Sequence, residues 1–149
     1  MSHDEMTAQS ELSALASTER GRRLLQLALR GVQQSGRGLT IGCWVKPDGG
    51  VSGCVFQHAY WQGVSEGAFQ ASAAADHELK AFVPDEDFRL VMGAIRALDA
   101  LGRHRFLRRH GLSRVLDEAA WRDTVERLLV DALADTAEAP EQRPILASS

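Results

Sequence analysis

Residues 39–61 read LTIGCWVKPDGGVSGCVFQHAYW, and this stretch decides which fold the sequence predicts. Its two ends, residues 39–46 and 51–61, are rich in the β-branched and aromatic residues that favour strands. The residues between them, 47–50, read PDGG, which is typical of a tight turn. The stretch therefore predicts an antiparallel β-hairpin with strands at about 39–46 and 51–61.

Two turn geometries are open for this hairpin, and they differ in whether Cys43 and Cys54 meet. A two-residue turn at Asp48-Gly49 places the cysteines directly opposite each other, where a disulfide or half a metal site becomes feasible. A type I turn centred on Pro47-Asp48 points the two sulfur atoms to opposite faces. Proline suits the first central position of a type I turn. The second geometry is therefore favoured, and the cysteines are expected to be unpaired.

The favoured register separates the two faces of the predicted ribbon, because side chains alternate along a strand. One face is apolar and suits a core: Leu39, Ile41, Cys43, Val45, Val51 and Val55. The other mixes aromatic and polar side chains: Thr40, Trp44, Lys46, Ser52, Cys54, Phe56, His58 and Tyr60. An aromatic surface of this kind needs cover. Either the protein's own helices or a partner, such as a second copy pairing edge to edge, can supply it.

Helical periodicity predicts three to four helices around the hairpin, at about 18–34, 86–101, 103–110 and 117–136. Apolar stripes mark the first, the second and the last of these helices. That of the first comprises Gly21, Leu24, Leu25, Ala28 and Val32. That of the last comprises Trp121, Val125, Leu128, Leu129 and Ala132.

Length and composition indicate one α+β domain. The chain has 149 residues, of which 44% are hydrophobic and 25% charged, values that are ordinary for a folded domain of this size. We expect the domain to span residues 10–136. Residues 1–9 are expected to be a flexible N-terminus, and residues 137–149, with two prolines and no periodicity, a disordered tail.

The expected compartment is the cytoplasm. No apolar run approaches the roughly 18 residues that span a bilayer. The first residues, MSHDEMTAQSEL, lack the basic start and apolar centre of a secretory signal. Two cysteines in a chain of this length suit a reducing compartment. We therefore expect no membrane partner, and neither a cofactor nor a metal is predicted.

Catalytic candidates are few. Cys54, His58 and His77 could form a small thiol site, since a reactive thiolate needs a nearby histidine or helix N-terminus. No family-type cysteine motif supports it. On a strand, Cys54 and His58 would stand roughly 13 Å apart, too far to share a metal ion. Asp99, on an otherwise apolar helix, is a further acid–base candidate, and the alternative is an ion pair with a nearby arginine such as Arg103.

A basic run, RHRFLRRHGLSR at 103–114, holds five arginines and no acid. A surface that contacts phosphate would have this composition, and Arg105, Arg108 and Arg109 are its candidate contacts. A helix face that pairs with the acidic C-terminal helix would have it too. The formal net charge of −3 favours the second interpretation, so nucleic acid is a less favoured partner.

The leading functional hypothesis is a non-enzymatic accessory or regulatory protein that acts as a homo-oligomer. Its expected binding surface is the aromatic face or edge of the hairpin: Trp44, Cys54, Phe56, His58, Tyr60 and Trp61. Two alternatives stay open. One is a small enzyme with a site around Cys54, His58 and His77, and the other is a nucleic-acid-binding module that uses the arginines of residues 103–114.

Overall fold

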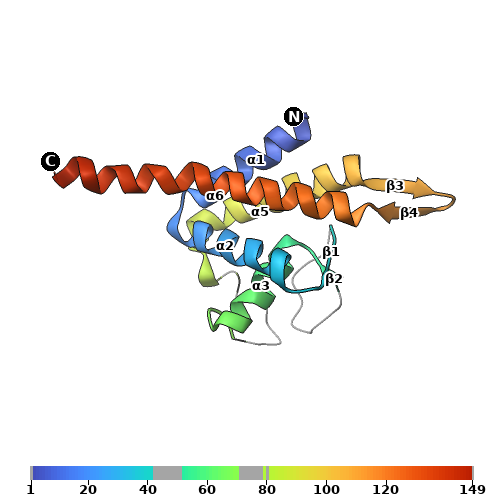
Figure 1. Cartoon of the computed structure of the whole chain (residues 1–149), viewed down its shortest axis with the longest axis horizontal. Coiled ribbons are helices and arrows are strands. Elements are labelled where there is room, and N and C mark those ends of the chain that lie inside the picture. The colour runs from blue at the N-terminus through green and yellow to red at the C-terminus, as the bar shows by residue number, and fades with distance from the viewer. Residues whose placement is uncertain (1, 42–51, 71–78, 80, 149) are drawn as a thin grey trace.

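A computed structural model describes residues 2–41, 52–70, 79 and 81–148 of the chain (Figure 1). Over these residues the protein is mostly helical and carries two small two-stranded sheets. The predicted α+β class agrees with the structure in this coarse form, whereas the position of the hairpin does not.

The N-terminal half begins with helices α1 (His3–Ala16) and α2 (Glu19–Gln34). The predicted helix at 18–34 is confirmed, and Thr18 caps it by accepting a hydrogen bond from the backbone N–H of Gly21. Residues 3–9, expected to be flexible, belong to α1. Its stripe was missed because its N-terminal members are Glu5 and alanine rather than large apolar residues.

The C-terminal half holds the two longest helices, α5 (Asp85–Leu101) and α6 (Glu118–Ser148). Both predicted helices are confirmed, and the backbone of α6 continues past the expected end at residue 136. The apolar stripe that predicts α6 is buried throughout: Trp121, Val125, Leu128, Leu129 and Ala132. Helix α1 packs against both α5 and α6, and α2 packs against α6 on another side.

The predicted second strand of the hairpin is wrong over residues 55–61, which form the first part of helix α3 (Val55–Glu66). This helix packs along α2. Residues 55–60, its first part, are all buried, so that Gln57 and His58 are as inaccessible as Val55. A helix without a polar face shows no helical period. Its β-branched and aromatic residues were therefore mistaken for a strand.

In the described parts of the two segments of the predicted hairpin, a short parallel bridge joins them. Strand β1 (Gly38–Leu39) pairs with β2 (Ser52–Gly53) in parallel register, not in the antiparallel register expected. The predicted turn, together with Cys43 and Trp44, lies outside the described residues. The structure therefore describes neither cysteine register.

An antiparallel hairpin does occur, but at the place where a short basic helix was predicted for 103–110. Helix α5 ends in a π-helical turn, η1 (Gly102–Phe106). Strands β3 (Leu107–His110) and β4 (Ser113–Leu116) follow and pair with each other. The turn between them is Gly111-Leu112, and Gly111 has a φ of 64°. A two-residue turn whose first central residue is a left-handed glycine is a common hairpin connection.

The β3–β4 hairpin projects from the end of the molecule opposite the C-terminus of α6 (Figure 1). Its base is held by the core. Phe106 is buried against Trp121, with ring centroids 5.4 Å apart. The backbone N–H of Asp117 also donates to the carbonyl oxygen of Phe106 at 2.8 Å. We call residues 107–116 the β-arm.

Candidate functional site

The aromatic residues expected to form a binding surface lie inside the protein. Phe56 and Tyr60 are at most 1% exposed, and the Tyr60 ring stacks on Phe69. His58 is fully buried, while Cys54 and Trp61 are half-buried. The protein's own helices therefore cover the described part of this set, and the basis for a homo-oligomer through these aromatic side chains is lost. Trp44 lies outside the described residues.

His58 is a structural residue rather than a free base. Its Nε2 lies 2.9 Å from the carbonyl oxygen of Gly38 and must therefore donate to it. Its Nδ1 then accepts from the hydroxyl of Ser35, 3.1 Å away, whose oxygen in turn accepts from the backbone N–H of Arg37. Both ring nitrogens are occupied, so that His58 has no nitrogen left to activate the Cys54 thiol.

The surroundings of His58 favour the neutral ring. Burial lowers the pKa of His58, and the charges of Arg122 and Arg37 act in the same direction. The carbonyl groups of Gly38 and Gly31 act in the opposite direction without cancelling this shift. The imidazole is therefore expected to stay neutral in the folded protein at neutral pH.

Two arginines complete this cluster around the end of α2. The guanidinium of Arg37 lies 4.1 Å from the centroid of the Trp61 ring, and Trp61 meets His58 edge to face at 5.2 Å. Arg122, from α6, donates to the carbonyl oxygens of Val32 and Arg37. These contacts tie α2, α3 and α6 together, which is a structural role.

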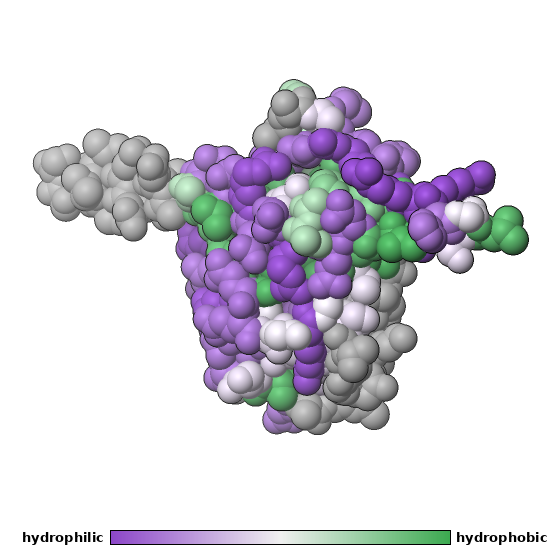
Figure 2. All heavy atoms as spheres, turned by 45° about the vertical axis from the view of Figure 1, so that its right-hand side comes forward, coloured by the Kyte–Doolittle hydropathy of each residue, from purple (hydrophilic) through white to green (hydrophobic). Residues whose placement is uncertain are grey.

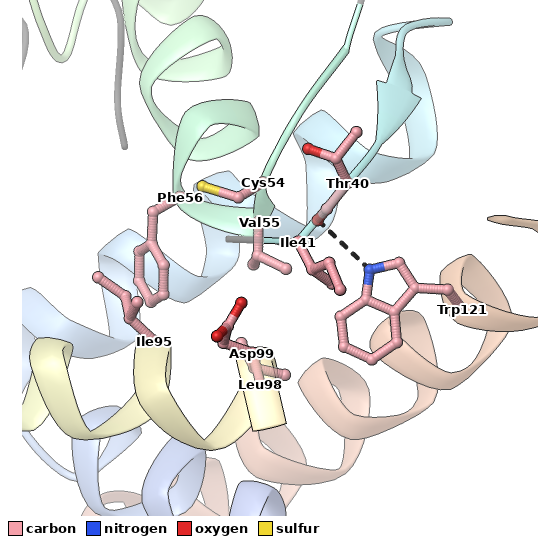
Figure 3. Close-up of a pocket in the computed structure, with 9 residues that line it drawn as sticks. All are labelled: Thr40, Ile41, Cys54, Val55, Phe56, Ile95, Leu98, Asp99 and Trp121. Atoms are coloured by element: carbon pink, nitrogen blue, oxygen red, sulfur yellow. Dashed lines mark hydrogen bonds between the residues drawn. The ribbon is translucent and has the colours of Figure 1, made fainter. Parts of the chain in front are cut away.

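A small cavity lies beside Cys54 (Figure 3). Its volume is about 30 Å³, enough for about two water molecules and too small for an organic substrate. Asp99 points into it from α5, facing the side chains of Val55 and Phe56. The Oδ1 of Asp99 is buried and has no hydrogen-bond partner among the described residues.

The other carboxylate oxygen of Asp99 forms an ion pair with Arg103, whose Nε lies 2.9 Å away. The ion pair considered as the alternative to acid–base catalysis is therefore present. His77 lies outside the described residues, so the structure does not bring the three catalytic candidates together. Within the described ranges, no group of three or more histidine, cysteine or acidic side chains is arranged to hold a metal ion.

The arginine cluster of residues 103–114 divides into two parts. Its first part is tied to the body: Arg103 pairs with Asp99, and Arg105 pairs with Glu5 on α1. Glu5 also receives a hydrogen bond from Arg127 at 3.0 Å. Burial raises the pKa of Glu5, but its hydrogen bonds with Arg127 and Arg105 and their positive charges outweigh burial and lower that pKa. Arg105 is thus a structural residue, not a free phosphate contact.

The second part of the cluster lies on the β-arm and has no such anchors. Arg108, Arg109 and Arg114 are exposed, and none of them makes an ion pair with any side chain that the structure describes. No acidic residue occurs between 107 and 116. The predicted pairing of these arginines with the acidic C-terminal helix is absent in the described part of the chain.

The ladder of the β-arm places two of these arginines against each other. Arg109 pairs directly with Arg114, while Arg108 faces Val115 and His110 faces Ser113. Like charges directly opposite each other destabilise a strand pair. An anion bound beside Arg109 and Arg114 would relieve this repulsion. An open hollow nearer the base is lined by Arg108, Arg109, His110, Val115 and Asp117.

The tip of the β-arm carries an apolar side chain, because Leu112 in the turn is fully exposed. Nearer the base, Val115 lies opposite Arg108 and exposes half of its surface. Figure 2 shows this projection on the right as mostly hydrophilic, with a hydrophobic end. The sequence signal for the arm was the pair Gly111-Leu112 between two short segments, and it was overlooked because residues 103–110 were predicted as a short basic helix.

Comparison with protein-family models, with curated proteins and with solved structures finds no match to this chain. None of the helices in the described part of the chain is both long and apolar enough to cross a bilayer.

Proposed function

We propose that this protein is a non-enzymatic binding protein that binds nucleic acid through the β-arm. The observation that carries the proposal is the set of three exposed arginines, Arg108, Arg109 and Arg114, on a projecting hairpin without acidic residues. Cations without partners that project from a protein surface are suited to phosphate groups.

The overall charge of −3 does not oppose this, because the charge is unevenly distributed. Two carboxylates of α1 are engaged by the turn that precedes the β-arm: Asp4 lies 2.9 Å from Nδ1 of His104, and Glu5 pairs with Arg105. At the foot of the arm, Asp117 accepts a hydrogen bond from the backbone N–H of Ala120, and Glu118 pairs with Arg122. Since residues 107–116 themselves contain no acid, a phosphate backbone that approaches the outer part of the β-arm meets mainly positive charge.

A binding role is better supported than a catalytic one. His58 uses both ring nitrogens in hydrogen bonds, and the cavity beside Cys54 admits only water. Two copies are not expected to pair arm to arm, because the arginines of one β-arm would face those of the other.

The test is binding of the full chain to labelled duplex and single-stranded DNA, followed by fluorescence anisotropy as salt rises from low concentration. We expect log K to fall linearly with log salt. The double variant Arg109→Ala/Arg114→Ala should reduce the slope for duplex DNA by about 2, because each phosphate contact contributes roughly 0.9.

The matched control is Arg89→Ala/Arg96→Ala, which removes two exposed arginines from α5 and leaves the β-arm intact. It should bind as the wild type does. Absence of binding to any nucleic acid at low salt would overturn the proposal, and so would an equal loss in both double variants.

A further inference from the structure

Both faces of the β-arm carry positive charge, and this distribution favours a partner that can contact both faces at once. Cross-strand partners share a face and neighbouring residues alternate. Arg109 and Arg114 therefore lie on one face, and Arg108 and His110 lie on the other. A flat acidic surface would contact one of these faces and leave the other in water. A groove with phosphates along both walls contacts both.

The dimensions of the β-arm agree with one groove in particular. The major groove of B-form DNA is about 12 Å wide and about 8.5 Å deep, and it admits a two-stranded ribbon. Stacked sheets lie about 10 Å apart, which sets the thickness of a ribbon with side chains of ordinary size, and four residues of strand extend about 13 Å. The minor groove, about 6 Å wide, is too narrow for it. The major groove of A-form RNA is deep and narrow and excludes it as well.

The tip of the β-arm carries a side chain that suits insertion into the major groove. Leu112 is fully exposed at the turn, so that it would be the first residue to reach the floor of the groove. The floor of the major groove presents the C5-methyl group of thymine, the apolar group that an aliphatic side chain can contact. In the free protein, by contrast, the exposed side chain of Leu112 contributes nothing to stability, because its apolar surface stays in water.

The base of the β-arm holds it in a defined direction. Phe106 is buried at the foot of β3, and the π-helical turn before it is tied to α1 by two pairs, Arg105 with Glu5 and His104 with Asp4. Asp117 lines the hollow at the base and would repel phosphate there. The part available for insertion is therefore the outer part, from the tip to Arg108 and Arg114.

Resting on the proposed function, we propose that the β-arm inserts tip first into the major groove of B-form DNA. Arg109 and Arg114 contact the phosphates of one wall and Arg108 those of the other. Leu112 contacts thymine methyl groups on the floor. The β-arm thereby reads a feature of the bases as well as the backbone.

The first experiment uses the full chain bound to a labelled duplex of mixed sequence, challenged with two competitors. Methyl green, which occupies the major groove, should displace the protein, and netropsin, which occupies the minor groove of A·T tracts, should not. The same sequence as duplex RNA should bind at least tenfold more weakly. Displacement by netropsin alone, or equal affinity for duplex RNA, would overturn the groove assignment.

The second experiment tests Leu112. Replacing thymidine by deoxyuridine removes the C5-methyl groups and should weaken wild-type binding by about fourfold for one methyl contact. The Leu112→Ser variant should show no such difference between the two duplexes. Val130→Ser, at an exposed apolar position on α6, should behave as the wild type. A thymidine preference that persists in Leu112→Ser would refute the tip contact.

The two proposals fail in different ways. If no nucleic acid binds, or if binding ignores the arginines of the β-arm, the proposed function itself fails. Binding can also depend on those arginines and yet be displaced only by netropsin, or be equally strong for single-stranded and duplex DNA. In that case only the assignment to the major groove fails.

Discussion

The imidazole Nε2 of His58 lies 2.9 Å from the carbonyl oxygen of Gly38, so that a buried ring on α3 is joined to the strand that follows α2. Burial of the same ring lowers its pKa and favours the neutral form, in which Nδ1 accepts from the hydroxyl of Ser35. This preference makes the stability of the fold dependent on pH.

We expect the free energy of unfolding to decrease as the pH falls below about 6.5, the ordinary histidine pKa. The folded-state pKa of His58 is lowered, so the unfolded chain takes up the proton first and is stabilised by it. Urea denaturation between about pH 5 and pH 8 measures the effect. His58→Gln should weaken the dependence, whereas His110→Gln, at an exposed position of the β-arm, should keep it. Equal pH slopes in the wild type and His58→Gln would contradict this account.

Gly31 provides the close approach of α2 and α3. A Cβ atom at this position would lie 2.4 Å from the carbonyl oxygen of His58, which is backbone and cannot move aside easily. Gly31→Ala should therefore lower the free energy of unfolding by about 1–3 kcal/mol. In Gly93→Ala, the new Cβ meets only the end of the Glu11 side chain, so that we expect no loss, or a gain of up to about 1 kcal/mol. Thermal and chemical denaturation of both variants check the contrast, and an equal loss would refute it.

Arg122 satisfies backbone carbonyl groups at and after the end of α2, those of Val32 and Arg37. Arg122→Met retains the aliphatic stem and removes the donors, so that the free energy of unfolding should fall by about 1–3 kcal/mol. Arg122→Lys should recover part of the loss, because an ammonium group donates but lacks the fork geometry. Arg96→Met, at an exposed position of α5, is the control in chemical denaturation. No difference between the Arg122 and Arg96 variants would show that water replaces these donors.

The cross-strand pair of Arg109 and Arg114 predicts opposite effects on the free and the bound protein. Arg114→Glu should replace repulsion by attraction and slow amide hydrogen exchange in the β-arm by about two- to fivefold. The same change should weaken DNA binding more than tenfold at low salt, because it places an acid against phosphate. Arg96→Glu changes the net charge equally and should do neither. Slower exchange together with unchanged DNA binding would show that the β-arm does not contact DNA.

The parts of the fold that the sequence predicts are those governed by local contacts, between residues that are close in sequence as well as in space. Helix α2 was found from its apolar stripe and its Thr18 cap, and α6 from the stripe that begins at Trp121. In both, one face is buried and the other is exposed, so that the period is visible in the sequence. Residues 55–60 of α3 are all buried, so that no exposed face reveals their period, and residues 55–61 were predicted as a strand for that reason.

The candidate site shows the same division. Sequence alone determined that Arg105, Arg108 and Arg109 belong to a basic run without acids. Only the tertiary structure decided that Arg105 is paired with Glu5, a hundred residues away, whereas the other two project on a hairpin. Charge is a property of each residue, but whether a charge is free for a partner depends on which distant carboxylates the packing of the helices brings beside it.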